Sequence, residues 1–174
     1  MKFFSANLQD LRELYGKTLQ KALDMEQQIT EALPTMVDKA TDPQLKDSFS
    51  VHLRETRTHV DKVSGILQDI YGQPQTAKCK VLSSLVTEAE DSIKDAKDPS
   101  VRDAALIACA QQVEHHEMAV YGTLRTWAEL LGESRQAETL NSILEQEKNA
   151  DSILTAISDR VNREAGAHRS SRAA

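Results

Sequence analysis

Turn signals divide this sequence into long stretches in which apolar residues recur every three or four positions, the spacing of one face of a helix. Two stretches follow Asp-Pro pairs, at 42–43 and 98–99, and a capping aspartate with proline in the first turn is a typical helix start. Two stretches end at a glycine, Gly72 and Gly132, where helices commonly stop. The pattern therefore predicts four long helices and a shorter amphipathic one. Their expected ranges are 7–39, 43–71, 100–131 and 134–163 for the long helices and 81–93 for the short one.

The lengths of the connections indicate how these helices pack. Short turns join the first helix to the second and the third to the fourth, so each pair is expected to form an antiparallel hairpin. The longer connection at 75–97 lets the second hairpin lie against the first with a crossover. We therefore predict an all-α, ferritin-like four-helix bundle at residues 1–163. The small and basic residues 164–174 are expected to form a disordered tail.

Composition narrows the class of protein. The net charge of −6 disfavours nucleic acid as a partner, because affinity for phosphate depends on Lys and Arg. No apolar run approaches the roughly 20 residues of a membrane span, and the N-terminus lacks the apolar segment of a signal peptide, so a cytoplasmic location is expected. Cys79 and Cys109 form no C-x-x-C pair, so neither a thiolate metal site nor a disulfide framework is expected.

Acidic side chains interrupt the apolar stripe of every long helix. In the third helix Glu117 falls where a core residue is due, and Glu114 lies three positions before it on the same side. In the second and fourth helices a glutamate is followed four residues later by another metal-binding side chain. The full set is Glu26, Glu55, His59, Glu114, Glu117, Glu147 and Asp151.

These acids need a partner if they are buried. A carboxylate without one is costly inside a protein, and two side by side must bind a proton or share a cation. In each predicted hairpin a lone glutamate is followed, after nearly the same number of residues, by a glutamate with its i+4 companion. Two such hairpins packed together would bring the groups to one level of the bundle, as in di-iron and di-manganese proteins. The sequence therefore predicts two metal ions as the partner.

The type of ligand indicates the type of metal. The predicted set is rich in carboxylates, contains a single histidine and has no thiolate, which favours Fe or Mn over Zn and over Cu. The usual Glu-x-x-His spacing is absent, because Thr58 and Ala150 occupy the i+3 positions and the ligand must come at i+4.

Other polar residues near these positions have simpler interpretations. His52 is expected to pack between helices, and one of the adjacent His115 and His116 must face away from the core. For Tyr121, one turn beyond Glu117, core packing is favoured over a hydrogen bond to a ligand. Any single glutamate on a helix is usually solvated, so the metal hypothesis depends on the joint pattern.

The chain resembles the YciE/YciF family of ferritin-like bacterial stress proteins over residues 5–160. The resemblance is carried by MEQQITEALPTM, HLRETRTHV, VRDAALIACAQQVEHHEMAVYGTLRTWAELLG and LEQEKNADSILT. It implies a ferritin-like fold, a homodimer and a di-metal carboxylate centre formed by the seven residues above. It does not supply a reaction.

Three hypotheses for function follow. The first is redox chemistry on a small oxidant, O₂ or H₂O₂, at a pair of Fe or Mn ions. The second is a stress protein that sequesters metal without turnover and acts through self-assembly. The third is a structural helical homodimer whose acids bind metal weakly. The sequence leaves open whether the protein is an enzyme.

Overall fold

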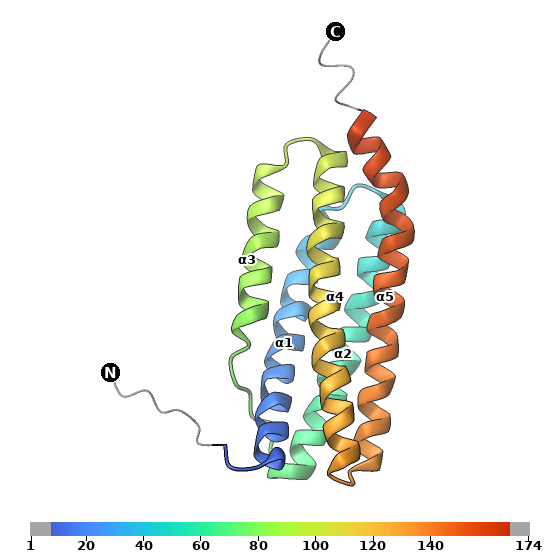
Figure 1. Ribbon diagram of the computed structural model, residues 1–174. Coiled ribbons are helices and arrows are strands. Elements are labelled where there is room, and N and C mark those ends of the chain that lie inside the picture. Colours follow the sequence, from blue (N-terminus) through green and yellow to red (C-terminus); the bar gives the residue numbers. More distant parts are fainter. Residues whose placement is uncertain (1–7, 168–174) are drawn as a thin grey trace, which may run out of the picture.

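The structure is a computed structural model, which describes residues 8–167, and it is all helical over that range (Figure 1). Four long helices run side by side, and a fifth, shorter helix lies outside them (Figure 1). The ferritin-like helical bundle predicted from the sequence is confirmed. The helices are α1 (Leu11–Lys39), α2 (Pro43–Tyr71), α3 (Lys80–Asp95), α4 (Pro99–Leu130) and α5 (Ser134–Ala167).

The helix starts follow from side-chain caps. The Asp42 carboxylate accepts a hydrogen bond from the Leu45 amide at the start of α2, and Asp98 caps α4 in the same way. The expected start of α1 near Asn7 is wrong, because Asp10 caps that helix through the Glu13 amide and the chain at 8–10 is not helical. Asn7 itself lies outside the described residues.

The helix ends depend on glycine and on local pairing. Gly72 and Gly132 have positive φ angles of 74° and 77°, which the α2 end and the α4–α5 turn require. Ser134 is the first helical residue of α5 rather than its cap, since the Glu133 carbonyl accepts the first helical bond. Residues 164–167, expected to belong to a disordered tail, are helical, because α5 continues to Ala167, with Arg160 and Glu164 paired one turn apart at 3.4 Å. Residues 168–174 of that tail lie outside the described range.

Packing joins the helices into two hairpins, α1 with α2 and α4 with α5. The hairpins meet where α1 contacts α4 and where α2 contacts α5, and the long connection carries α3 across the outside of α1 and α4 (Figure 1). The core is mostly aliphatic, but Leu82 is the only residue of α3 that is fully buried. Among the described helices, none has an apolar segment of the length needed to cross a bilayer.

Candidate metal centre

Ionisable side chains from all four long helices are buried together in the middle of the bundle. Each occupies the inward face of its helix; Glu26, for example, follows Leu19 and Leu23 and precedes Ile29 and Leu33 at helical spacing. Their exposed fractions range from zero to 6%. The side chains are Glu26 on α1, His52 and His59 on α2, Glu114 and Glu117 on α4, and Glu147 on α5.

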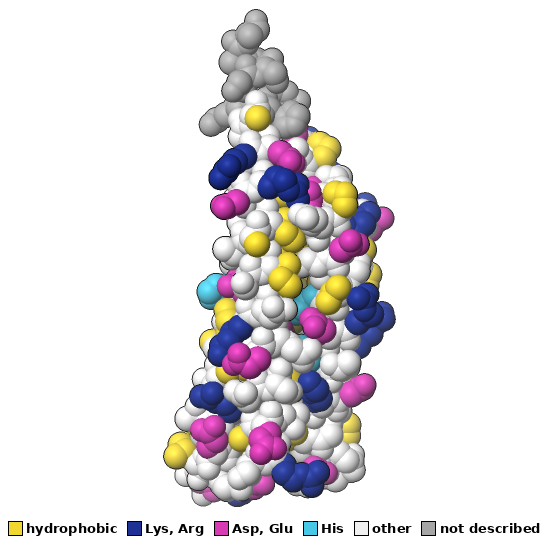
Figure 2. Space-filling view, turned by 90° about the vertical axis from the view of Figure 1, so that its right-hand side faces the viewer, with side chains coloured by type: hydrophobic (Ala, Val, Ile, Leu, Met, Phe, Trp, Pro, Cys, Tyr) yellow, Lys and Arg dark blue, Asp and Glu magenta, His cyan; other side chains and the backbone are white. Residues whose placement is uncertain are grey.

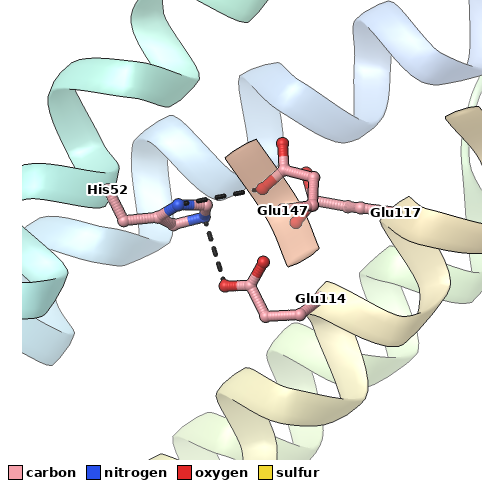
Figure 3. A group of neighbouring side chains, drawn as sticks. All are labelled: His52, Glu114, Glu117 and Glu147. Atoms are coloured by element: carbon pink, nitrogen blue, oxygen red, sulfur yellow. Dashed lines mark ion pairs between the residues drawn. The ribbon is translucent and has the colours of Figure 1, made fainter. Parts of the chain in front are cut away.

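These side chains form two groups whose donor atoms lie within 4.8 Å of one another. Glu147 belongs to both groups. The first group is His52, Glu114, Glu117 and Glu147; the second is Glu26, His59 and Glu147. In Figure 3 the labelled side chains of the first group converge from α2, α4 and α5 on one small volume. The arrangement has the form of two adjoining cation sites with a common carboxylate.

His52 lies between two carboxylates of the first group. Its Nε2 is 3.4 Å from Glu114 Oε1 and its Nδ1 is 3.9 Å from Glu147 Oε2 (Figure 3). Neither ring nitrogen has a hydrogen-bond partner within the described protein. Either ring nitrogen of His52 is therefore available to bind a cation.

His59 connects the cluster to a polar network nearer the surface. Its Nδ1 lies 2.9 Å from Glu147 Oε1 and 3.6 Å from Glu26 Oε2, and its Nε2 lies 3.2 Å from Gln146 Oε1. Since an amide oxygen can only accept, Gln146 favours a proton on Nε2 and leaves Nδ1 facing the carboxylates. Burial lowers the pKa of His59, but the contacts with Glu147 and Glu26 outweigh it and raise the pKa to about 10. Without a metal, His59 is thus a cation that balances part of the acidic charge.

The remaining carboxylate charge is not balanced by the protein. Burial raises the pKa of Glu26, Glu114 and Glu117, and the nearby charge of Glu147 raises each of them further. Protons or a cation must therefore neutralise this cluster.

Most donor atoms of the cluster lack a hydrogen bond from the protein. Both oxygens of Glu117 are buried without a hydrogen-bond partner among the described residues, as are Glu26 Oε2, Glu114 Oε2 and Glu147 Oε2. Glu147 Oε1 lies 2.9 Å from the His59 ring, which belongs to the same cluster. Buried polar atoms are nearly always paired, so a set of unpaired ones converging on one volume calls for a ligand. Carboxylate oxygen and imidazole nitrogen are ligands of Fe, Mn and Zn, so the residues fit a metal centre.

Tyr121 supports the cluster from α4. Its hydroxyl is fully buried and donates a hydrogen bond to Glu26 Oε1. Burial raises the pKa of Tyr121 well above its ordinary value, and the Glu26 charge raises it further, so the phenol stays protonated and remains a donor. The side chain thus does more than the core packing favoured from the sequence, because it orients a carboxylate of the second group.

The family model described as "Domain of unknown function (DUF892)" matches residues 10–166 of this chain. The chain belongs to the DUF892 family.

Relatives with solved structures have the same bundle. Protein YciF of Escherichia coli K12 is 34% identical over 161 residues, which cover 91% of this chain and 97% of YciF. The crystal structure described as the E. coli stress protein YciF superposes with a TM-score of 0.85 at 32% identity, over 90% of this chain and 99% of that one. YcfI from Rhodopseudomonas palustris gives a TM-score of 0.84 at 36% identity, over 88% of this chain and 98% of that one. The resemblance to the YciE/YciF proteins is confirmed.

Two of the residues predicted for the site of this DUF892 chain lie outside both groups. Glu55 is half-buried, and its Oε1 accepts a hydrogen bond from Gln146 Nε2 at 3.4 Å. Asp151 is also half-buried and lies 3.5 Å from His115 Nε2. Each is turned by about 100° from an inward-facing neighbour, Thr56 or Ala150, because that is the rotation per residue of an α-helix.

His52 is the residue of this centre that the sequence analysis assigned to another role. It precedes His59 by seven residues, which is close to two helical turns and places both rings on one face of α2. That spacing was the available signal. With His52 included, the cluster contains four glutamates and two histidines, whereas the sequence analysis expected a single histidine.

Proposed function

We propose that this protein is a ferritin-like di-metal protein that performs redox chemistry on O₂ or peroxide in the bacterial stress response. The observation that carries the proposal is Glu147, a fully buried carboxylate that belongs to both groups of donors. A carboxylate in that position can bridge two cations, and its close contact, His59 Nδ1 at 2.9 Å from Oε1, is itself a donor of the second group.

The two groups divide the ligands between two ions. One ion would be held by His52, Glu114, Glu117 and Glu147, and the other by Glu26, His59 and Glu147. Four carboxylates and two imidazoles, with no thiolate among them, favour Fe or Mn over Zn as a working hypothesis. A pair of such ions supplies electrons to O₂ or peroxide and takes them back from a reductant.

The protein's own residues would prepare the centre for metal. Glu114 and Glu117 must lose protons before they bind a cation, so loading should release protons to solvent. Tyr121 holds Glu26 through its hydroxyl, and Gln146 sets the tautomer of His59 that presents Nδ1. His59 thereby acts as a neutral ligand once metal replaces its proton.

A relative supports the proposed stress role, and the exposed apolar side chains of α2 and α5 support a proposed homodimer. YciF of E. coli is described as a stress protein, and this supports a stress role for the present protein.

We also propose that the protein is a cytoplasmic homodimer. Val51 of α2 and Ile153 of α5 are about two-fifths exposed, at 42% and 39%. Figure 2 shows hydrophobic side chains gathered along the upper half of the α5 side of the molecule, among charged ones, as expected of an interface.

The first experiment measures metal per chain by elemental mass spectrometry, on protein purified without an affinity tag or chelator. The expected result is two Fe or Mn per chain. A content below one per chain, after anaerobic loading with Fe(II) and Mn(II), would contradict the proposal.

A second experiment separates turnover from storage. Metal-loaded protein is expected to consume H₂O₂ faster than the same metal free in buffer. Equal rates would contradict redox catalysis on peroxide and favour the alternative, a stress protein that sequesters metal without turnover.

A further inference from the structure

An apolar cavity lies between α3 and the bundle. It has a volume of about 280 Å³, and its walls come from α1, α2, α3 and α4, with Leu82, Val86 and Ile93 of α3 on one side and Ala110 and Val113 of α4 on another. It is open to solvent on one side, where exposed residues line it, so it is a pocket beneath α3 and not an enclosed void of the core. It also explains why the apolar face of α3 is only partly buried, since that face covers a cavity along much of its length.

The inner end of the cavity reaches the metal centre. His52 and Glu114 are part of its lining, and both belong to the first donor group. Glu114 Oε2 and both ring nitrogens of His52 are buried without hydrogen-bond partners in the described chain. The cavity is thus apolar along its walls and has unpaired polar atoms at one end, the arrangement typical of a small-molecule site.

The outer part of the cavity is polar and acidic. Glu31 of α1 and Glu90 of α3 line it, and both are exposed. The cation among the lining residues is Lys78, which also lies 3.8 Å from Asp24. The excess of carboxylates disfavours an anionic ligand such as a fatty acid, and the apolar walls disfavour a strongly hydrated cation.

We propose that this cavity binds a neutral organic molecule with an unbranched apolar chain and a small uncharged polar end, such as an alcohol or an alkyl hydroperoxide. The chain lies beneath α3 and the polar end lies at Glu114 and His52. The inference rests on the proposed function for one point, that the inner end faces a metal centre. O₂ or H₂O₂ alone would leave most of the volume empty, so the cavity fits a substrate larger than either.

The test of the cavity is binding of octanol to the full-length, metal-loaded protein, measured by isothermal titration calorimetry. Ala89 of α3 lines the cavity, so Ala89→Phe should fill it and weaken octanol binding about tenfold or more. Ser84→Phe is the matched control, because Ser84 lies on the same helix but is exposed and away from the lining. Thermal denaturation checks that both variants fold. Absence of octanol binding to the wild-type protein, or equal binding by the two variants, would overturn the proposal.

The charge of the ligand provides a second arm. Octanoate should bind more weakly than octanol, because Glu31 and Glu90 repel its carboxylate. The double variant Glu31→Gln/Glu90→Gln should bring the affinity for octanoate closer to that for octanol, without changing the affinity for octanol. Tighter binding of octanoate by the wild-type protein would overturn the assignment of a neutral ligand and indicate a fatty acid.

The orientation is tested separately with Co(II)-loaded protein. Octanol should shift the visible absorption of the bound Co(II), because its hydroxyl lies beside two ligands of the first group. Binding without such a shift would overturn the orientation. Metal content distinguishes the two proposals. Octanol binding to protein that takes up no metal would contradict the proposed function but support the cavity site. Full metal content without octanol binding would support the metal centre but contradict the cavity site.

Discussion

Two regions of this protein bury carboxylates, and they differ in what surrounds the oxygens. Near one end of the bundle, Asp103 of α4 accepts hydrogen bonds from the Thr41 amide at 2.9 Å, the Thr41 hydroxyl at 2.5 Å and the Asp42 amide at 2.8 Å. In the middle, neither oxygen of Glu117 accepts a hydrogen bond from the described protein. Asp103 is satisfied by hydrogen bonds from the turn at Thr41 and Asp42, whereas the glutamates of the cluster require protons or a cation.

The pKa shifts of the two regions have opposite directions. Asp42 at the end of the bundle has a lowered pKa, chiefly because Arg160 donates a hydrogen bond to it. Glu117 in the middle has a raised pKa, chiefly because burial disfavours its charge. Burial of an acid therefore does not by itself indicate a site. A site is indicated by burial combined with convergence of the acids and oxygens that lack hydrogen bonds. Four predictions test this comparison between the end and the middle of the bundle.

The largest effect is expected from Glu147→Gln, because this residue serves both donor groups. Metal content should fall from two ions per chain to less than one, and the rise in melting temperature on adding metal should disappear. Elemental mass spectrometry and calorimetry measure the two effects. Glu145→Gln is the control, since Glu145 lies on the exposed face of α5 and pairs with Lys148 at 2.8 Å. Full metal content in Glu147→Gln would remove the shared carboxylate from the centre.

Asp103→Ala should reduce stability and leave metal binding intact. The change leaves the Thr41 and Asp42 amides without their acceptor, and the free energy of unfolding should fall by about 3 kcal/mol. Denaturant unfolding measures the loss. The exposed Asp91, paired with Lys94 at 3.2 Å, is the comparison, and Asp91→Ala should cost about 0.5 kcal/mol or less. Loss of metal in Asp103→Ala would mean that the two regions are coupled.

Without metal, the protein should become less stable as the pH rises from 5 to 8. Glu114 and Glu117 have raised pKa values in the folded state, so their stabilising contribution is complete below the ordinary value of 4.5 and is lost as pH rises through the folded value. His59 changes in the same direction between its ordinary value of 6.5 and about 10. Urea unfolding of chelator-treated protein at several pH values measures the trend. Glu117→Gln should flatten it, and an increase in stability over this range would contradict the raised values.

The smallest effect is expected from Glu55→Ala and Asp151→Ala. Glu55 reaches the cluster through Gln146 and His59 rather than directly, so metal content should stay near that of the wild type and affinity should fall a few-fold. Competition with a metal chelator measures the affinity. A loss as large as that of Glu147→Gln would show that these carboxylates bind the metal directly, as the sequence analysis expected.

Much of the fold follows from local signals that act within a few residues. The two Asp-Pro starts and the two positive-φ glycines set the ends of helices that apolar spacing had already indicated. The height of the site along the bundle was also predictable, because acidic residues at core-facing helix positions point into the core at that height. Five predicted residues lie in the cluster: Glu26, His59, Glu114, Glu117 and Glu147.

The rest of the site depends on how far each helix is turned about its axis. On α2, the apolar side chains of Leu53 and Val60 are only partly buried. The fully buried face instead contains His52, Thr56 and His59. The i+4 spacing of Glu55 and His59 led the sequence analysis to place both in the site and to leave His52 outside it.

The sequence by itself determined the number of helices, their approximate limits and the depth at which acids meet, because helix period and turn chemistry act locally. Only the tertiary structure decided which face of α2 and α5 points inward, and therefore that His52 replaces Glu55 and Asp151 in the cluster. It also decided that α3 covers a cavity instead of sealing the core. Adjacent helix positions differ by about 100° in direction, and the packing of all four helices together selects between them.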